Sequence, residues 1–212
     1  MAPKFFKLPV CVGDVTLNVA KGHFATSHSH TNYFIDVTAQ KASLREAEAV
    51  AQQLAEHHLS NTMVDTILCL DGTAVLGTCL AEELTRRGVQ TINTHQSIYV
   101  LEPEYNANSQ IIFRDNIQPM IRGKHVLVLM ASVTTGFTAR RSMEAIGYYG
   151  GKVSGVAAVY RAIDEVAGYP IWSIYSVADL PEYESYDFKD CPYCKAGKKL
   201  DALVNSFGYS AL

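Results

Sequence analysis

The chain has 212 residues, of which 48% are hydrophobic and 18% charged, and its net charge is −3. This length suffices for one domain with its own core, and the composition excludes a disordered chain. The lack of a basic excess argues against general nucleic-acid binding, and no apolar run reaches the ~20 residues of a membrane span. The N-terminal residues do not resemble a secretory signal, so we expect a cytoplasmic protein.

The first part of the chain predicts a β-hairpin followed by a helix. The sequences VTLNVA (15–20) and NYFIDVT (32–38) carry the β-branched and aromatic residues that strands favour. A polar turn is predicted between them, over 23–31. Leucine, valine and alanine then recur at three- and four-residue spacing over 43–59, which predicts an amphipathic helix.

The rest of the chain alternates short apolar runs with helical segments. The runs that are typical of buried strands cover 64–70, 97–102, 125–130, 153–161 and 171–177. Helices are predicted over 74–87 and 139–151. Strands that alternate with helices favour an α/β fold, with a central parallel sheet of about five strands and helices on both faces.

The strand over 125–130 runs into a hydroxyl-rich turn and then directly into a helix. The candidate residues are Ser132, Val133, Thr134, Thr135, Gly136, Phe137 and Thr138. Backbone N–H groups of such a turn converge on one spot, and the positive end of the helix dipole adds to them. The segment therefore predicts a phosphate site; an ordinary strand–turn–helix connection with a threonine cap is the alternative.

The segment HVLVLMASVTTGFT resembles the phosphoribosyl pyrophosphate (PRPP) motif of type I phosphoribosyltransferases. Three further segments resemble orotate phosphoribosyltransferases in the same order: the hairpin GHFATSHSHTNYFIDV, the loop DGTA and the strand VAAVYRAIDE. The resemblance covers about residues 20–165. It implies a phosphoribosyltransferase-like domain over 1–180, with an N-terminal hairpin hood from about 1–42, and a homodimer.

The resemblance also implies which residues contact the ligand. The phosphate of PRPP or of a nucleotide would lie on the turn over 132–138. Asp71, Gly72 and Thr73 would face pyrophosphate and Mg²⁺. The residues that would hold the base are Tyr33, Phe34 and Arg161.

Three charged features of the family are missing. Met130 and Ala131 stand where the motif has two acidic residues that hold the ribose hydroxyls. Thr26 stands where the family has a lysine that meets the base. The segment 97–124 corresponds to the mobile catalytic loop, but it begins acidic and contains only Arg114, Arg122 and Lys124 as basic residues.

No catalytic residue can therefore be assigned from the sequence, and two hypotheses follow. The first is an enzyme that transfers phosphoribosyl from PRPP to an orotate-like base. The second is a non-catalytic module that holds a nucleotide or another phosphorylated ligand on the same fold. The loss of the charged groups favours the second, whereas the phosphate turn and Arg161 fit both.

Cys191 and Cys194 form a Cys-x-x-Cys pair in a C-terminal tail over 181–212. Such a pair can bind one Zn²⁺ ion, but zinc takes four ligands. The second pair would come from His28 and His30, which face the same side of a strand, or from a partner subunit. A redox dithiol and a plain reduced turn are alternatives for the cysteines, and a polar hairpin tip over the base site is the alternative for the histidines.

Overall fold

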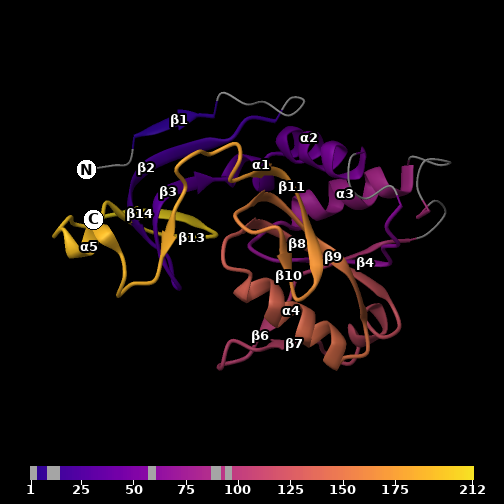
Figure 1. Ribbon diagram of the computed structural model, residues 1–212. Helices are drawn as coiled ribbons and strands as arrows, with labels where there is room; N and C mark the ends of the chain where they lie inside the picture. Colours follow the sequence, from indigo (N-terminus) through magenta and orange to yellow (C-terminus); the bar gives the residue numbers. More distant parts are fainter. Residues whose placement is uncertain (1–3, 9–14, 57–60, 87–91, 94–96) are drawn as a thin grey trace.

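The computed structural model describes residues 4–8, 15–56, 61–86, 92–93 and 97–212. Within these ranges the chain forms a central sheet covered by helices and a second sheet beside it (Figure 1). The second sheet contains the predicted hood and is called the hood sheet below. None of the described helices is long and apolar enough to cross a membrane.

The central sheet has the strand order β10-β11-β9-β8-β4-β5, and every pair is parallel except β10 with β11. Its strands are β4 (Thr66–Cys69), β5 (Tyr99–Leu101), β8 (His125–Val133), β9 (Lys152–Arg161), β10 (Glu165–Val166) and β11 (Tyr169–Ser176). The predicted parallel α/β fold and its five apolar strands are thereby confirmed. Strands that are buried on both faces need continuous apolar runs, which is why the sequence reveals them.

Helices cover both faces of this sheet, as Figure 1 shows. α2 (Leu44–Leu54) and α3 (Ala74–Arg86) lie on one face, and α4 (Phe137–Tyr148) lies on the other. Alternate side chains of β8 join the two core clusters, with Leu127 on the α2–α3 side and Val128 on the α4 side. The predicted ends of the helices over 43–59 and 74–87 fall outside the described residues.

The hood sheet has the order β12-β3-β2-β13-β14, and β1 also pairs with β2. Its strands are β1 (Phe5–Lys7), β2 (Asn18–Ala25), β3 (His30–Asp36), β12 (Ser185–Tyr186), β13 (Ala202–Asn205) and β14 (Gly208–Ala211). The predicted turn over 23–31 is too long, because β2 continues to Ala25 and β3 begins at His30. The polar residues of this segment hid the strand ends, although several of them are buried.

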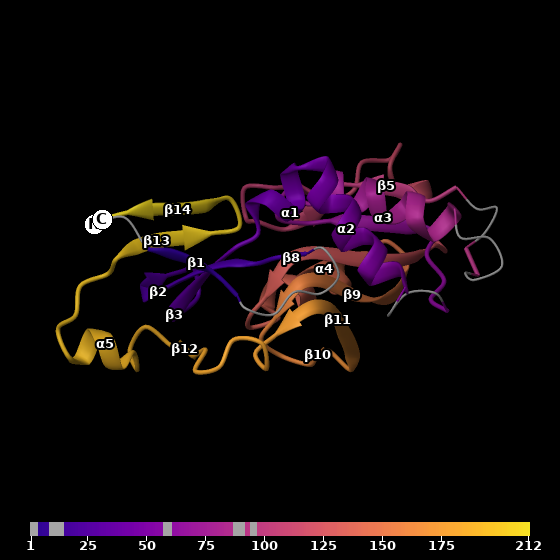
Figure 2. The same cartoon turned by 90° about the horizontal axis from the view of Figure 1, so that it is seen from above.

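The C-terminal residues complete the hood sheet. β12 pairs with β3, and β13 runs parallel to β2 with Ala202 opposite Phe24. Figure 2 shows the β13–β14 hairpin beside β1 and β2, with α5 (Pro192–Lys195) at the same end of the molecule. Segments from the two ends of the sequence therefore build one sheet.

Four further short elements lie outside the two large sheets. α1 (Thr38–Ala42) follows β3 and was not predicted, because five residues carry too little hydrophobic periodicity. β6 (Glu104–Tyr105) and β7 (Ile111–Ile112) form a hairpin that lies against α4, where Arg141 donates a hydrogen bond to the Ser109 carbonyl at 2.9 Å. The 3-10 helix η3 (Gln118–Met120) precedes β8.

Candidate functional site

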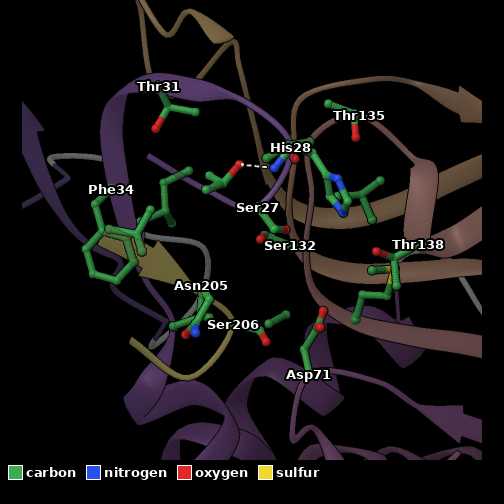
Figure 3. A pocket seen from close by; sticks show the side chains of 18 of the residues that line it. Ser27, His28, Thr31, Phe34, Asp71, Ser132, Thr135, Thr138, Asn205 and Ser206 are labelled. Atoms are coloured by element: carbon green, nitrogen blue, oxygen red, sulfur yellow. Dashed lines mark hydrogen bonds between the residues drawn. The ribbon is translucent and has the colours of Figure 1, made fainter. Parts of the chain in front are cut away.

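A cavity of about 280 Å³ lies between the hood sheet and the C-terminal ends of β4 and β8. Four segments supply most of its lining: the tip and end of the β2–β3 hairpin, the β4–α3 turn, the β8–α4 turn and the β13–β14 turn. Tyr183, which precedes β12, completes the lining. Figure 3 shows Thr31 and Phe34 from the hood on one side and Thr135 and Thr138 on the other, with Ser206 below them.

The β8–α4 turn supplies every residue of the predicted phosphate site, 132–138, to the cavity wall. Gly136 adopts φ 73°, and a Cβ atom there would lie 2.9 Å from Ile163 Cδ1. Only glycine suits this conformation without strain. The turn therefore has a physical requirement for Gly136.

The N-terminus of α4 opens at this turn. Among the described residues no side chain caps it, so the threonine cap considered as an alternative is not formed. The first N–H groups of a helix have no intrahelical partner, and together with the helix dipole they attract an anion. The hydroxyl groups of Thr134, Thr135 and Thr138 border the same space.

Asp71, Gly72 and Thr73 form the sharp turn between β4 and α3. Asp71 and Gly72 both have positive φ, at 59° and 73°. Thr73 is buried, and its hydroxyl donates to the Leu70 carbonyl at 2.7 Å. Of the predicted pyrophosphate residues only Asp71 lines the cavity, while Gly72 and Thr73 shape the turn.

The Asp71 carboxylate is held at the base of the cavity. Burial raises the pKa of this carboxyl group, although the nearby Ala131 N–H, the Lys41 charge and the Ser206 side chain act to lower it. The Lys41 ammonium donates to the Asp71 carbonyl at 2.8 Å and also to the Ser206 carbonyl. Burial lowers the pKa of Lys41, because its charge too has lost water.

The wall beside Asp71 carries no charge of its own. Met130 and Ala131 both line the cavity and are 4% and 1% exposed. The carboxylates of the cavity come instead from Asp71 and from Asp36, at the end of β3. Asp36 Oδ1 accepts the Thr38 N–H at 3.0 Å, which fixes its orientation.

The predicted base residues separate in the structure. Tyr33 and Phe34 both line the cavity, but as neighbours on β3 they belong to different clusters, the central core and the hood core. Arg161 is not among the described residues that line the cavity. Its guanidinium group donates to the Ile171 carbonyl at 2.9 Å and pairs with Asp164 at 3.3 Å.

Basic side chains are scarce at the site. The described residues that line the cavity include no lysine or arginine, and His28 is their basic group. In the segment that corresponds to the catalytic loop, Arg114 is paired with Glu104, at 2.8 Å between Nε and Oε2. A second, wider hollow of about 1080 Å³ shares His28 with the cavity and contains Arg141.

Sequence reasoning missed several residues of the site. Asn205, the last residue of β13, and Ser206, in the two-residue turn that follows, line the cavity; the run Asn-Ser-Phe-Gly would have indicated this turn. His28 was not missed: it lies at the hairpin tip and lines the cavity, with its ring 4.9 Å from that of Phe137, as the alternative to a metal ligand predicted. Lys41 carries no signal in the sequence.

Two histidines lie beside the cysteine pair, and one of them, His30, is a predicted ligand. Cys191 and Cys194 lie with His23 and His30, and one potential ligand atom from each residue lies within 4.8 Å of the other three. His23 replaces His28 in this group, because the longer β2 places it beside His30. The cluster is a candidate metal site on the hood sheet.

Comparison with solved structures identifies the class of fold. A phosphoribosyltransferase from Corynebacterium diphtheriae has a TM-score of 0.52 at 19% identity and covers 75% of this chain and 90% of that one. The orotate phosphoribosyltransferase of Mycobacterium tuberculosis has a TM-score of 0.51 at 19% identity, with coverage of 76% and 91%. The chain therefore has the type I phosphoribosyltransferase fold.

Sequence comparison adds the particular relatives. The orotate phosphoribosyltransferase of Caldanaerobacter subterraneus is 26% identical over 183 residues, which cover 84% of this chain and 86% of the relative. That of Chlorobaculum parvum is 28% identical over 189 residues, with coverage of 85% and 86%. No protein-family model matches the chain. The chain is thus similar to orotate phosphoribosyltransferases, with a PRPP motif that has lost its acidic pair.

Proposed function

We propose that this protein is an orotate phosphoribosyltransferase-like protein that binds PRPP in the cavity and transfers its phosphoribosyl group to an orotate-like base. The observation that carries the proposal is the uncapped N-terminus of α4, which opens into the cavity through the Gly136 turn. That arrangement suits a phosphomonoester. The similarity to orotate phosphoribosyltransferases supports both the reaction and the base.

In the proposed complex each wall of the cavity has one task. The N–H groups and hydroxyls of 132–138 bind the 5′-phosphate, and Asp71 faces the ribose and pyrophosphate. Tyr33 and Phe34 border the base, and Arg161 would have to leave the Ile171 carbonyl to reach it. In the reaction the bond from C1′ to the pyrophosphate oxygen breaks, a bond from C1′ to a base nitrogen forms, and pyrophosphate leaves.

The carboxylates of Asp71 and Asp36 are hard oxygen donors of the kind that Mg²⁺ prefers, so the cavity fits the ion that this class of fold implies. Bound there with pyrophosphate, Mg²⁺ would neutralise the charge of the leaving group. The chain itself supplies little such charge, since the lining residues include no lysine or arginine. We therefore expect transfer to depend strictly on Mg²⁺ and to be slow.

A second candidate is a non-catalytic nucleotide-binding module. Met130 and Ala131 favour it, because apolar side chains cannot hold ribose hydroxyls or stabilise developing positive charge. The phosphate turn and the hood would be kept in such a module, because both serve binding. The identity of the curated relatives, all of which are enzymes by name, supports the first candidate.

A transfer assay separates the two candidates. The purified full chain is incubated with PRPP and Mg²⁺, with or without orotate, and pyrophosphate release is measured; uracil and adenine serve as control bases. Release that requires orotate supports the proposed transferase. Binding of a nucleoside monophosphate without release from PRPP with any of the three bases would overturn the transferase and establish the module.

A further inference from the structure

Four metal-ligating side chains meet on the hood sheet, outside the cavity. His23 lies on β2 and His30 on β3, while Cys191 and Cys194 flank the first turn of α5. None of the four is among the described residues that line the cavity. The cluster therefore has no part in the proposed transfer reaction.

The separations between the four atoms match a tetrahedral metal site. His23 Nε2 lies 3.1 Å from His30 Nδ1, and Cys194 Sγ lies 3.3 Å from His30 Nδ1. Cys191 Sγ and Cys194 Sγ lie 3.4 and 3.6 Å from His23 Nε2. A tetrahedral Zn²⁺ ion with ordinary bond lengths sets its ligands about 3.3 Å apart for two nitrogens and about 3.6 Å apart for nitrogen and sulfur.

Hydrogen bonding alone does not account for this convergence. The other ring nitrogen of His23, Nδ1, lies 3.0 Å from the Lys198 carbonyl oxygen and 3.2 Å from the Lys199 carbonyl oxygen. Both carbonyl oxygens can only accept a hydrogen bond. The Nδ1 atom therefore carries the proton, and Nε2 presents a single lone pair. His30 Nδ1 and the Sγ atoms of both cysteines lie near that one lone pair. Histidines that bind metals have this arrangement, because a hydrogen bond from the other ring nitrogen fixes their tautomer.

The surroundings of the cluster suit a permanent site. His23 and Cys191 are fully buried, and His30 is 9% exposed. The rings of Tyr193 and Phe188 pack against the two histidines, with ring centres 5.3 Å from His23 and 5.1 Å from His30, while Cys194 is exposed. The two cysteines are free thiols rather than a disulfide.

We infer that His23, His30, Cys191 and Cys194 bind one structural Zn²⁺ ion. The mixed imidazole and thiolate donors, the tetrahedral spacing and the lack of an open ligand position are those of closed structural zinc sites. Both thiols lose a proton on binding, so that two thiolates balance the charge of the ion. This inference does not depend on the proposed function.

The ion would fasten the C-terminal segment to the hood. Beyond the cluster, Asp201 Oδ2 accepts the His23 N–H at 2.7 Å, and the Asp201 N–H donates to the His23 carbonyl at 2.8 Å. β13 then starts beside β2 and leads to the turn that places Ser206 in the cavity. The site thus ties residues more than 160 positions apart in the sequence.

The metal content of the full chain gives the first test. We expect about one zinc per chain by elemental analysis after purification without added metal, because a site with four protein ligands, three of them buried, retains zinc tightly. Replacement by Co²⁺ should give the visible absorption of a tetrahedral site with thiolate ligands. Zinc well below one per chain after growth in zinc-supplemented medium, or a Cys191–Cys194 disulfide in the fresh protein, would overturn the inference.

Variants locate the site. Cys194→Ser and His23→Gln should each lose most of the zinc and lower Tm, and Cys194 is exposed enough for that variant to fold. His28→Gln and Cys79→Ser are matched controls, since both residues lie outside the cluster, and both variants should keep their zinc. Equal zinc in Cys194→Ser and Cys79→Ser, with both folded by circular dichroism, would contradict the assignment.

Discussion

Gly136 is the residue on which the phosphate turn depends most directly. Its positive φ strains any residue that has a Cβ atom, and that atom would lie 2.9 Å from Ile163 Cδ1, which would have to shift. Gly136→Ala should therefore lower the free energy of unfolding by about 1–2 kcal/mol and weaken phosphate binding, because the turn must tilt. Urea unfolding and calorimetry with inorganic phosphate measure the two effects.

Gly147 in α4 is the matched control. A Cβ atom there meets nothing within 4 Å, and alanine favours a helix over glycine by up to about 1 kcal/mol. Gly147→Ala should therefore stabilise the protein and leave phosphate binding intact. If both alanine variants bind phosphate as the wild type does, the turn is not the phosphate site.

Asp71 illustrates a cost in stability at a binding site. Because burial raises the pKa of its carboxyl group, ionisation favours the unfolded chain. Below the pKa of about 3.9 that an unfolded chain has, the carboxyl group is protonated in both states and does not lower the free energy of unfolding. The loss of stability develops as the pH rises from there through the raised pKa of the folded state. Asp71→Asn should therefore raise the free energy of unfolding at pH 7 by on the order of 1 kcal/mol.

The pH dependence is the decisive measurement for Asp71. The stability difference between Asp71→Asn and the wild type, measured by urea unfolding, should vanish near pH 3 and grow toward pH 7. The same variant should lose the Mg²⁺-dependent part of PRPP binding, because the amide is a poor ligand for the ion. A stability difference that stays constant with pH would contradict this explanation.

At the scale of elements, Lys41 joins α1, the β4–α3 turn and the β13–β14 hairpin. Its ammonium group donates to the carbonyls of Asp71 and Ser206, and the side chain is buried. Lys41→Met should lower the free energy of unfolding by about 2–3 kcal/mol and loosen the β13–β14 hairpin. The reason is that the carbonyls of Asp71 and Ser206 lose their donor and the Asp71 carboxylate loses a nearby positive charge. Hydrogen exchange of β13 and β14 reports the loosening.

Lys21 provides the comparison for Lys41. It forms an exposed ion pair with Glu182, 2.7 Å between Nζ and Oε2, and such pairs contribute little. Lys21→Met should leave stability nearly unchanged. If Lys21→Met and Lys41→Met lose similar amounts of stability, the buried Lys41 contacts have no special role in holding the β13–β14 hairpin.

The elements also show where sequence reasoning succeeds. The interior strands of the central sheet could be predicted because burial on both faces requires continuous apolar runs, of which β8 is the clearest, whereas the two-residue edge strand β10 was not predicted. The hood could be predicted only in part. β12, β13 and β14 have two to four residues each. β12 and β13 join the hood through β3 and β2, which lie far away in the sequence, so only the β13–β14 turn has a local signal.

The candidate site shows the same division. The phosphate turn is one continuous segment, so its residues could be recognised together. Tertiary contacts place Ser206 at the cavity and bring Lys41 to the Ser206 carbonyl, and the orientation of Arg161 depends on its bond to the Ile171 carbonyl. None of these could be read from spacing along the chain.

On the scale of the whole molecule, two sheets enclose one cavity whose chemistry is uneven. Backbone N–H groups and hydroxyl groups line one wall, and aromatic rings and carboxylates line the others. No lysine or arginine is among the described lining residues. Such a cavity suits a phosphorylated ribose better than free pyrophosphate. The homodimer that the sequence resemblance implies stays a prediction, which sedimentation of the full chain would test.

Calorimetric titration of the full chain with PRPP, with and without Mg²⁺, tests the central claim most directly. The proposed site predicts binding that Mg²⁺ strengthens and that Gly136→Ala weakens at least tenfold, while Gly147→Ala binds as the wild type does. The absence of PRPP binding to the folded wild-type protein under both conditions would contradict the claim that this cavity holds a phosphoribosyl ligand.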